Sequence, residues 1–173
     1  RQITFNTLAD GTYDDCTITV TDNAGNTSDN LSVSSFTIDT TAPKLSEVTP
    51  VHTPTNDNTS LSYTFSSTEA GTIKYGNCTG SPDNASADNN TITFDALADG
   101  TYDNCTISVD NNSNTSDNLS VSSFTIDTTA PALDNVTIAS NNSDNTTLAK
   151  TDDVITLSIT SAEAEAIKTP SVS

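Results

Sequence analysis

One segment of this chain, NTSDNLSVSSFTIDTTAP, occurs twice without a difference, at residues 26–43 and again at 114–131. A related segment precedes each copy: ITFNTLADGTYDDCTITV at 3–20 returns as ITFDALADGTYDNCTISV at 92–109. The copies are 89 residues apart before the intervening loop and 88 after it, so this loop is one residue shorter in the second copy. Self-similarity at a period of this length indicates an array of like modules.

The period sets the expected module boundaries. A length of about 88 residues lies within the size range of one small domain. We therefore predict that residues 1–43 are the C-terminal part of one module, 44–131 a complete module, and 132–173 the N-terminal part of a third. Because the third DTTAP is not reached, we expect the chain to be a segment of a longer array.

The charge of the chain narrows the classes of partner. Lys and Arg total 5 against 23 Asp and Glu, which gives a formal net charge of −18. Binding to nucleic acid needs basic side chains that replace counterions, so we expect no nucleic-acid partner. No stretch approaches the ~20 apolar residues of a membrane helix, and no apolar signal-peptide core follows Arg1. We expect no membrane insertion in this segment.

Apolar and polar residues alternate in short runs, which is typical of strands that bury one face. Disorder, the alternative for so acidic and polar a chain, does not predict this periodicity. With an initial strand near Leu45 and Val48, the runs give six or seven strands, which favours an all-β fold of tandem immunoglobulin-like antiparallel β-sandwich modules. The apolar positions are Leu61, Tyr63 and Phe65; Ile73 and Tyr75; Ile92 and Phe94; Cys105, Ile107 and Val109; and Leu119, Val121, Phe124 and Ile126.

Two further details refine the strand pattern. The pair Ser122–Ser123 shifts the alternation by one, which predicts a bulge or a change of sheet. In the third module, Ile155, Leu157 and Ile159 repeat the first apolar run of the complete module, after a polar loop that is six residues longer. Surface loops tolerate such insertions.

Three motifs together resemble those of a known family: the LADGTY turn, the TDNAGNTS loop at 21–28 and the terminal FTIDTTAP. In combination they are similar to the bacterial Ig-like repeats that form long arrays in surface adhesins and biofilm-associated proteins. The resemblance covers essentially the whole chain. It implies a secreted or cell-surface protein, with calcium ions at the junctions between modules.

The three cysteines fit the repeat, because Cys16 and Cys105 are equivalent positions and Cys78 is the remaining one. A Cys78–Cys105 disulfide would close a loop of about 27 residues, and Cys16 would then be unpaired in this chain. Reduced buried cysteines and a metal site are the alternatives, although no CxxC motif or His cluster supports a metal. Tyr102 lies where immunoglobulin-like domains carry a tyrosine corner; a Tyr buried for packing explains it equally well.

Residues for catalysis are scarce. His52 is the only histidine, and it lies in the polar segment VHTPTND, where a solvated loop residue is expected. The Ser and Thr residues alternate with apolar ones, as solvent-facing strand positions do. We therefore expect the protein not to be an enzyme.

Carboxylates are the remaining candidate ligands, because Ca²⁺ prefers hard oxygen donors. In a seven-stranded sandwich the last strand of one module ends near the loops of the next. At the first junction this predicts calcium ligands from Asp39 with Asp10 or Asp14, and from Glu69 and Asp110 of the complete module. At the second junction, the corresponding residues are Asp127 with Asp99 or Asp103, and Glu163. The alternative is that these Asp residues cap turns.

The leading interpretation is a structural one, in which tandem modules form the stalk of an extracellular bacterial adhesin. Near-identical modules favour it, because a spacer needs only length and stiffness. One alternative is a module that binds carbohydrate or a host surface through a long loop at Gly80 to Asn90, although that loop holds no aromatic residue. Another is a subunit of an extracellular filament or surface layer. Expected partners are neighbouring modules and, in a filament, other copies.

Overall fold

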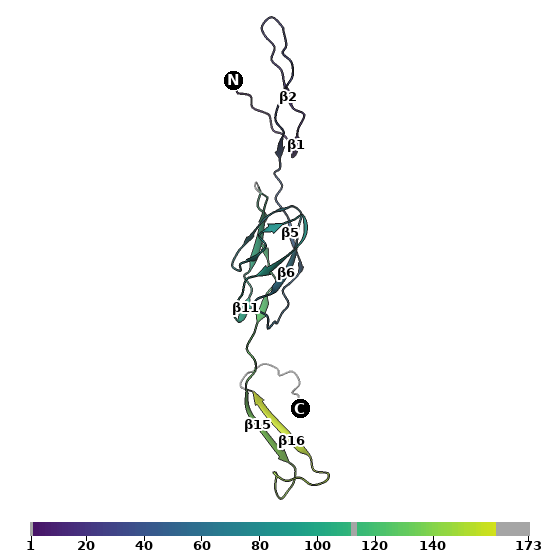
Figure 1. Ribbon diagram of the computed structural model, residues 1–173, viewed down its shortest axis with the longest axis vertical. Helices are drawn as coiled ribbons and strands as arrows, with labels where there is room; N and C mark the ends of the chain where they lie inside the picture. The colour runs from purple at the N-terminus through teal and green to yellow at the C-terminus, as the bar shows by residue number, and fades with distance from the viewer. Residues whose placement is uncertain (1, 112–113, 162–173) are drawn as a thin grey trace. The chain divides into compact units, whose positions relative to one another are not determined.

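The computed structural model describes residues 2–111 and 114–161. Strands, turns and loops make up all of the described chain (Figure 1). Every pairing between the named strands is antiparallel, whereas an isolated bridge between Thr55 and Ile126 is parallel. Within these residues, no helix is long and apolar enough to cross a membrane. Contacts divide the chain into two units, Arg1–Asp127 and Thr128–Ser173, so the division falls inside the second DTTAP segment.

The complete module consists of two four-stranded sheets and one short strand pair. The first sheet has the order β5-β6-β10-β8, the second has the order β13-β12-β7-β9, and β11 pairs with β14. The strands are β5 (Leu45–Thr49), β6 (Leu61–Ser67), β7 (Gly71–Tyr75), β8 (Gly80–Ser81), β9 (Asn84–Ala85), β10 (Asp88–Phe94), β11 (Gly100–Tyr102), β12 (Thr106–Asp110), β13 (Leu119–Ser120) and β14 (Phe124–Ile126). The all-β, antiparallel class expected from the sequence is therefore confirmed.

One apolar core lies between the sheets and gives the module a sandwich-like build. Alternate residues of β6 and β10 are buried, with polar residues between them facing solvent. Most of the predicted apolar positions belong to this core, and Tyr75 and Leu119 pack at its edge. Burial of a large apolar side chain contributes roughly 1.5–3 kcal/mol to folding, so this cluster is the main source of the module's stability.

The predicted irregularity at Ser122–Ser123 is a change of sheet. Before it, β13 pairs with β12 in the second sheet; after it, β14 pairs with β11. Val121 and Phe124, on either side of the serine pair, are both buried. The switch therefore keeps both halves of the segment pointing into the core, as the shifted alternation predicted.

The prediction of a long loop at Gly80 to Asn90 is wrong. This segment contains β8, β9 and the start of β10, and it connects the two sheets. The side chain of Asn90 stabilises the bend: its Oδ1 accepts the backbone N–H of Ser86 at 2.8 Å, and its Nδ2 donates to the carbonyl of Asp88 at 2.8 Å. Two- and three-residue strands carry too little periodicity to be recognised from sequence, which is also why the LADGTY segment is typical of a turn although its last three residues, Gly100–Tyr102, form β11.

Residues 2–43 contain the short pairs of the module without its long strands. Here β1 (Gly11–Tyr13) pairs with β4 (Phe36–Ile38), and β2 (Thr17–Ile18) pairs with β3 (Leu31–Ser32). These pairs correspond through the repeat to β11–β14 and β12–β13. Their apolar residues are half-buried or exposed.

The second unit contains the hairpin formed by β15 (Leu133–Ser140) and β16 (Ile155–Ser161). Val136 faces Ile159 and Ile138 faces Leu157 across the pair, and a bulge lies between Leu133 and Asn135. The corresponding pair β5–β6 also carries a bulge. This similarity agrees with the register predicted for the third module.

Candidate functional site: an acidic joint between Asp39 and the complete module

Two of the calcium ligands predicted at the first junction, Asp39 and Glu69, lie close together and share a hydrogen-bond donor. Asp39 follows β4, Glu69 lies in the turn between β6 and β7, and Asn111 follows β12. The side-chain amide of Asn111 donates to Asp39 Oδ2 at 3.1 Å and also contacts Glu69 Oε2. Nearby, Asn114 Nδ2 donates to the Asp39 carbonyl at 3.0 Å. We call Asp39, Glu69, Asn111 and Asn114 the acidic joint.

Backbone packing explains why Glu69 and Asn111 are neighbours. Strand β7 pairs with β12 so that Thr72 faces Asp110, which places the turn before β7 beside the loop after β12. A Cβ at Gly71 would lie 2.5 Å from the carbonyl oxygen of Asp110, so only glycine allows this approach. The Ser67 hydroxyl donates to the Glu69 carbonyl at 2.6 Å and holds the turn.

The joint offers two carboxylates and an amide, which is a set of hard oxygen donors suited to Ca²⁺. Glu69 is half-buried, whereas Asp39 is exposed. Asp39 Oδ2 and Glu69 Oε2 both accept from one amide N–H₂ group, which is a neutral donor. Asp39 Oδ1 accepts the backbone N–H of Thr41 at 3.0 Å, so Asp39 also caps a turn. Across residues 2–111 and 114–161, no group of three or more His, Cys, Asp or Glu side chains is close enough to hold a metal ion.

Asp10 caps a turn and does not join the acidic joint for which it was predicted as a calcium ligand. Its carboxylate accepts the backbone N–H of Thr40 at 3.1 Å and the Thr40 hydroxyl at 2.8 Å. The bond from the Thr40 backbone, followed by that from its hydroxyl, lowers the pKa of Asp10 below its ordinary value. This is the turn-capping alternative, here between β1 and the segment after β4. Asp14 is exposed in the connection between β1 and β2.

Asp110 is half-buried at the end of β12, where its backbone bridges to Thr115. At the second junction, Asp127 and Asp99 hold the positions equivalent to Asp39 and Asp10, and Asp103 is exposed after β11. The backbone N–H of Asp127 donates to the Thr55 carbonyl at 2.9 Å. Glu163, the predicted ligand from the third module, lies outside the described residues.

Sequence reasoning missed Asn111 and Asn114. Their equivalents in the first module are Asp22 and Asn26, in a loop where Asp22 Oδ1 accepts the N–H of Asn26 at 2.8 Å. Asn111 Oδ1 accepts the N–H of Asn114 in the same way, at 3.0 Å. Hydrogen bonds from the side chain and then the backbone of Asn26 lower the pKa of Asp22. Aligning the two loops residue by residue would have identified Asn111 as the position where a carboxylate becomes an amide.

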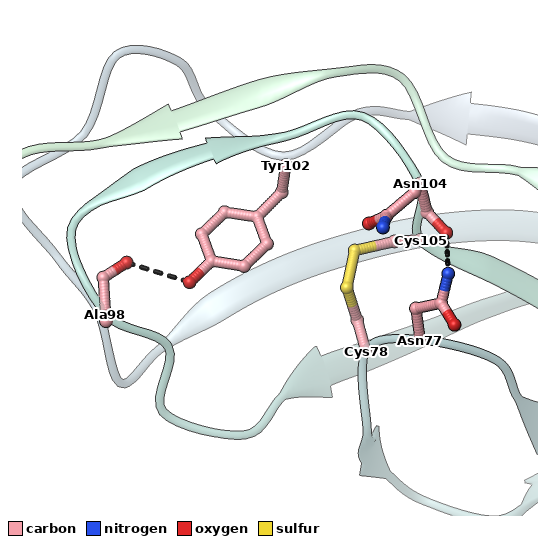
Figure 2. Close-up of a disulfide and its surroundings, with 6 residues drawn as sticks. All are labelled: Asn77, Cys78, Ala98, Tyr102, Asn104 and Cys105. Atoms are coloured by element: carbon pink, nitrogen blue, oxygen red, sulfur yellow. Dashed lines mark hydrogen bonds between the residues drawn. A yellow bond between two sulfur atoms is a disulfide. The ribbon is translucent and has the colours of Figure 1, made fainter.

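The disulfide expected from the sequence, Cys78–Cys105, is present, with a Cα–Cα distance of 5.2 Å (Figure 2). It joins the chain after β7 to the residue before β12, and both sulfurs belong to the core. Beside it, Asn77 Nδ2 donates to the Asn104 carbonyl at 3.1 Å. Cys16 is a free, half-buried cysteine.

Tyr102 combines the two roles considered for it. Its hydroxyl donates to the Ala98 carbonyl at 2.9 Å, four residues upstream, as a tyrosine corner does (Figure 2). Its ring stacks on Phe124 at a centroid distance of 5.3 Å. The residue therefore fixes the turn before β11 and also packs against the core.

A shallow hollow of about 190 Å³ is lined in part by His52, Asp57 and Ser60. These are the residue types of a hydrolytic triad, but the Asp57 carboxylate is bonded to the backbone and not to His52. Its Oδ1 accepts the backbone N–H groups of Thr59 at 2.9 Å and of Ser60 at 3.0 Å, so it caps a turn. His52 is exposed, as its polar segment predicted.

Comparisons of this chain with protein-family models, with curated proteins and with solved structures find no match.

Proposed function

We propose that this chain is a structural segment of an extracellular bacterial adhesin, in which tandem Ig-like modules form a stalk. The observation that carries the proposal is the acidic joint: Asp39, at the end of one repeat copy, bonds to the loop after β12 in the next copy. A spacer needs such a connection between like modules, whereas a binding module does not require it. The disulfide fits an oxidising, extracellular environment.

Two features support Ig-like connectivity for the complete module. An immunoglobulin sandwich places its strands in sheets ABED and CFG, and the orders β5-β6-β10-β8 and β13-β12-β7 follow the same scheme. The second feature is the Tyr102 corner beside the disulfide strand. The strand β9 then extends the second sheet at its edge.

Calcium is the ion we propose for the acidic joint. Asp39 and Glu69 would hold it with their carboxylates, and the ion would replace the Asn111 N–H₂ group that both carboxylates now accept from. Bound there, the ion would neutralise the two carboxylates and link the segment after β4 to the complete module. Two formal charges give a weak site, on the order of the 10⁻⁴–10⁻³ M typical of extracellular modules.

The test is thermal and chemical unfolding of the 173-residue chain with Ca²⁺ or with chelator. At a Ca²⁺ concentration ten times the Kd, binding stabilises the folded state by about 1.4 kcal/mol. The variant Glu69→Gln should lose this response. Glu47→Gln is the matched control, because Glu47 lies on β5 and bonds to Ser122 instead of joining the acidic joint.

Small-angle scattering checks the mechanical part of the proposal. A stiffened joint should give a larger maximum dimension in Ca²⁺ than in chelator, and Glu69→Gln should remove the difference. If neither the unfolding free energy nor the maximum dimension of the unaltered chain changes with Ca²⁺, the calcium site is rejected. The carbohydrate-binding alternative has lost its main support, since Gly80–Asn90 is not a free loop.

A further inference from the structure

Asparagine in this chain is followed, two residues later, by serine or threonine more often than composition predicts. The chain contains 19 Asn residues, and 13 of them begin an Asn-X-Ser/Thr triplet, none with proline in the middle. Ser and Thr together number 56 of 173 residues, so random placement gives about 6 such triplets. The exact duplication adds only two of the 13, at Asn114 and Asn118. This triplet is the acceptor motif for N-glycosylation.

Strand alternation does not explain the excess. Residues two apart share a face of a strand, so an exposed Asn would have polar neighbours equally often before it and after it. Ser or Thr lies two residues before Asn in only 6 cases, the number expected from composition. It lies one residue after Asn in 8 cases and three residues after in 3. The excess is therefore confined to the position that the acceptor motif specifies.

The structure places these asparagines at the surface. All 13 are exposed or half-buried. The one buried Asn among the described residues is Asn90, which has Ile92 two positions later and so does not begin a triplet. An oligosaccharide is bulky and hydrated, so an acceptor Asn has to lie at the surface of the folded protein.

Three of these side chains in the complete module are accessible and carry no other bond. Asn84, Asn89 and Asn118 are exposed, and their amides make no hydrogen bond within residues 2–111 and 114–161. Elsewhere the amide is already occupied. Asn77 Nδ2 donates to the Asn104 carbonyl at 3.1 Å, and Asn114 Nδ2 donates to the Asp39 carbonyl at 3.0 Å.

Two of the three accessible asparagines lie at the edges of one sheet. In the second sheet, ordered β13-β12-β7-β9, Asn84 belongs to the edge strand β9 and Asn118 directly precedes the edge strand β13. Ala85, next to Asn84, is buried, so strand alternation directs the Asn84 side chain away from the core. Edge strands present unpaired N–H and C=O groups that another chain can pair with. A glycan at each edge would prevent that pairing.

We propose that this protein is N-glycosylated and that Asn84, Asn89 and Asn118 are acceptor residues of the complete module. The donor is an oligosaccharide joined to a lipid through a diphosphate. The Asn Nδ2 forms a bond to the anomeric carbon of the first sugar, the bond from this carbon to the diphosphate oxygen breaks, and the lipid diphosphate leaves with the electron pair. One amide proton passes to a base of the transferase, and Nδ2 keeps the other.

The proposal goes beyond the stalk function and does not depend on the calcium site. It agrees with the Cys78–Cys105 disulfide, because both modifications belong to exported proteins.

Mass spectrometry of the protein isolated from the cells that naturally produce it tests the modification. An amidase that releases N-glycans in isotope-labelled water converts each glycosylated Asn to a labelled Asp. The label is expected at Asn84, Asn89 and Asn118, and a sample without amidase controls for spontaneous deamidation. Peptides with the masses of the unmodified sequence at all three positions would overturn the proposal.

Transfer to the folded chain tests the choice of sites. The unmodified 173-residue chain is incubated with a lipid diphosphate-linked oligosaccharide and a transferase specific for Asn-X-Ser/Thr. Asn118→Gln and Ser120→Ala should each abolish the glycan at residue 118, whereas Ser120→Thr keeps the hydroxyl and should retain it. Asn77 and Asn114 should be modified less than Asn118, because their amides are occupied. Equal modification of all three, or a glycan at Asn118 that survives Ser120→Ala, would reject the assignment.

Aggregation on heating tests the protection of the sheet edges. Glycosylated chain carrying Asn84→Gln and Asn118→Gln should aggregate faster than the unaltered glycoprotein, as followed by light scattering. Asn89→Gln is the matched control, since β10 lies inside the first sheet between β6 and β8. Equal aggregation of the double variant and the control would show that the glycans do not protect the edges.

Discussion

Residues 2–43 and 91–131 have nearly the same sequence, but their apolar side chains are buried to different extents. The second region pairs with β6 and β7 and buries its apolar side chains, whereas the first has no such strands beside it in the described chain. The local contacts are nevertheless the same in both. Tyr13 donates to the Ala9 carbonyl at 2.9 Å, as Tyr102 does to Ala98.

The short strand pairs are also shared. Gly11 faces Ile38 in β1–β4, as Gly100 faces Ile126 in β11–β14. Threonine hydroxyls bond across both pairs, Thr12 to Thr37 at 3.1 Å and Thr101 to Thr125 at 3.0 Å. Turns and neighbouring strands are therefore specified locally, while burial depends on strands from distant parts of the sequence.

The largest expected difference concerns the phenylalanine shared by both regions. Phe94→Ala should destabilise the complete module by about 3–5 kcal/mol, because it leaves a cavity in the core. Phe5→Ala should change the unfolding free energy of the chain by less than about 0.5 kcal/mol, as exposed substitutions do. Urea unfolding followed by tyrosine fluorescence measures both. Comparable losses would mean that the two regions share one cooperative core.

Next in size is the loss of the disulfide. Cys78→Ala with Cys105→Ala should lower the stability of the complete module by about 3–4 kcal/mol, since the bridge restricts a loop of some 27 residues in the unfolded chain. Cys16→Ala is the matched control and should leave the urea midpoint unchanged. An equal shift in the control would show that Cys16 supports the same core.

A smaller effect is expected at the tyrosine corner. Tyr102→Phe removes the hydrogen bond to Ala98 and keeps the ring on Phe124, so the loss should be about 0.5–1.5 kcal/mol. Tyr13→Phe removes the same bond from residues 2–43 and should not alter the unfolding of the complete module. Thermal melts by circular dichroism distinguish the two variants.

The smallest effect depends on pH and concerns Glu47, which has no counterpart in residues 2–43. Partial burial acts to raise the pKa of Glu47, but bonds from the Ser122 hydroxyl at 2.6 Å and backbone at 2.9 Å lower it overall. A lowered folded pKa adds stability above the ordinary value of 4.5, and this stability disappears as pH falls through the folded pKa.

Glu47→Gln should therefore cost less than about 1 kcal/mol at pH 7, given its exposure to solvent screening. The difference from the unaltered chain should vanish in acid below the folded pKa. Melting curves between pH 7 and the acid range measure it, and Ser122→Ala should reproduce the pattern. A difference that grows as the pH falls would contradict this assignment of the pKa.

Much of the fold could be predicted from sequence, and the misses have physical reasons. The runs at β6, β10 and β12 are long enough for alternation to reveal the buried face, and the Ser122–Ser123 shift gave the change of sheet. Strands β8, β9 and β11 are two or three residues long, so they form only through pairing with partner strands that the local pattern does not identify. At the candidate site, the sequence predicted that Asp39 and Glu69 lie at the first junction. It did not predict Asn111, which lies beside Glu69 because of the register of β7 against β12.

The sequence by itself determined the modular period, the all-β class and the local turns, because these depend on residues a few positions apart or on direct repetition. Only the tertiary structure decided how the short strands β8, β9 and β11 pair, since their partners lie elsewhere in the chain. It also decided that Asp10 caps the Thr40 turn, while Asp39 both accepts the N–H of Thr41 and reaches the joint. Both Asp residues belong to the repeated sequence, but their hydrogen-bond partners differ because folding places them beside different loops.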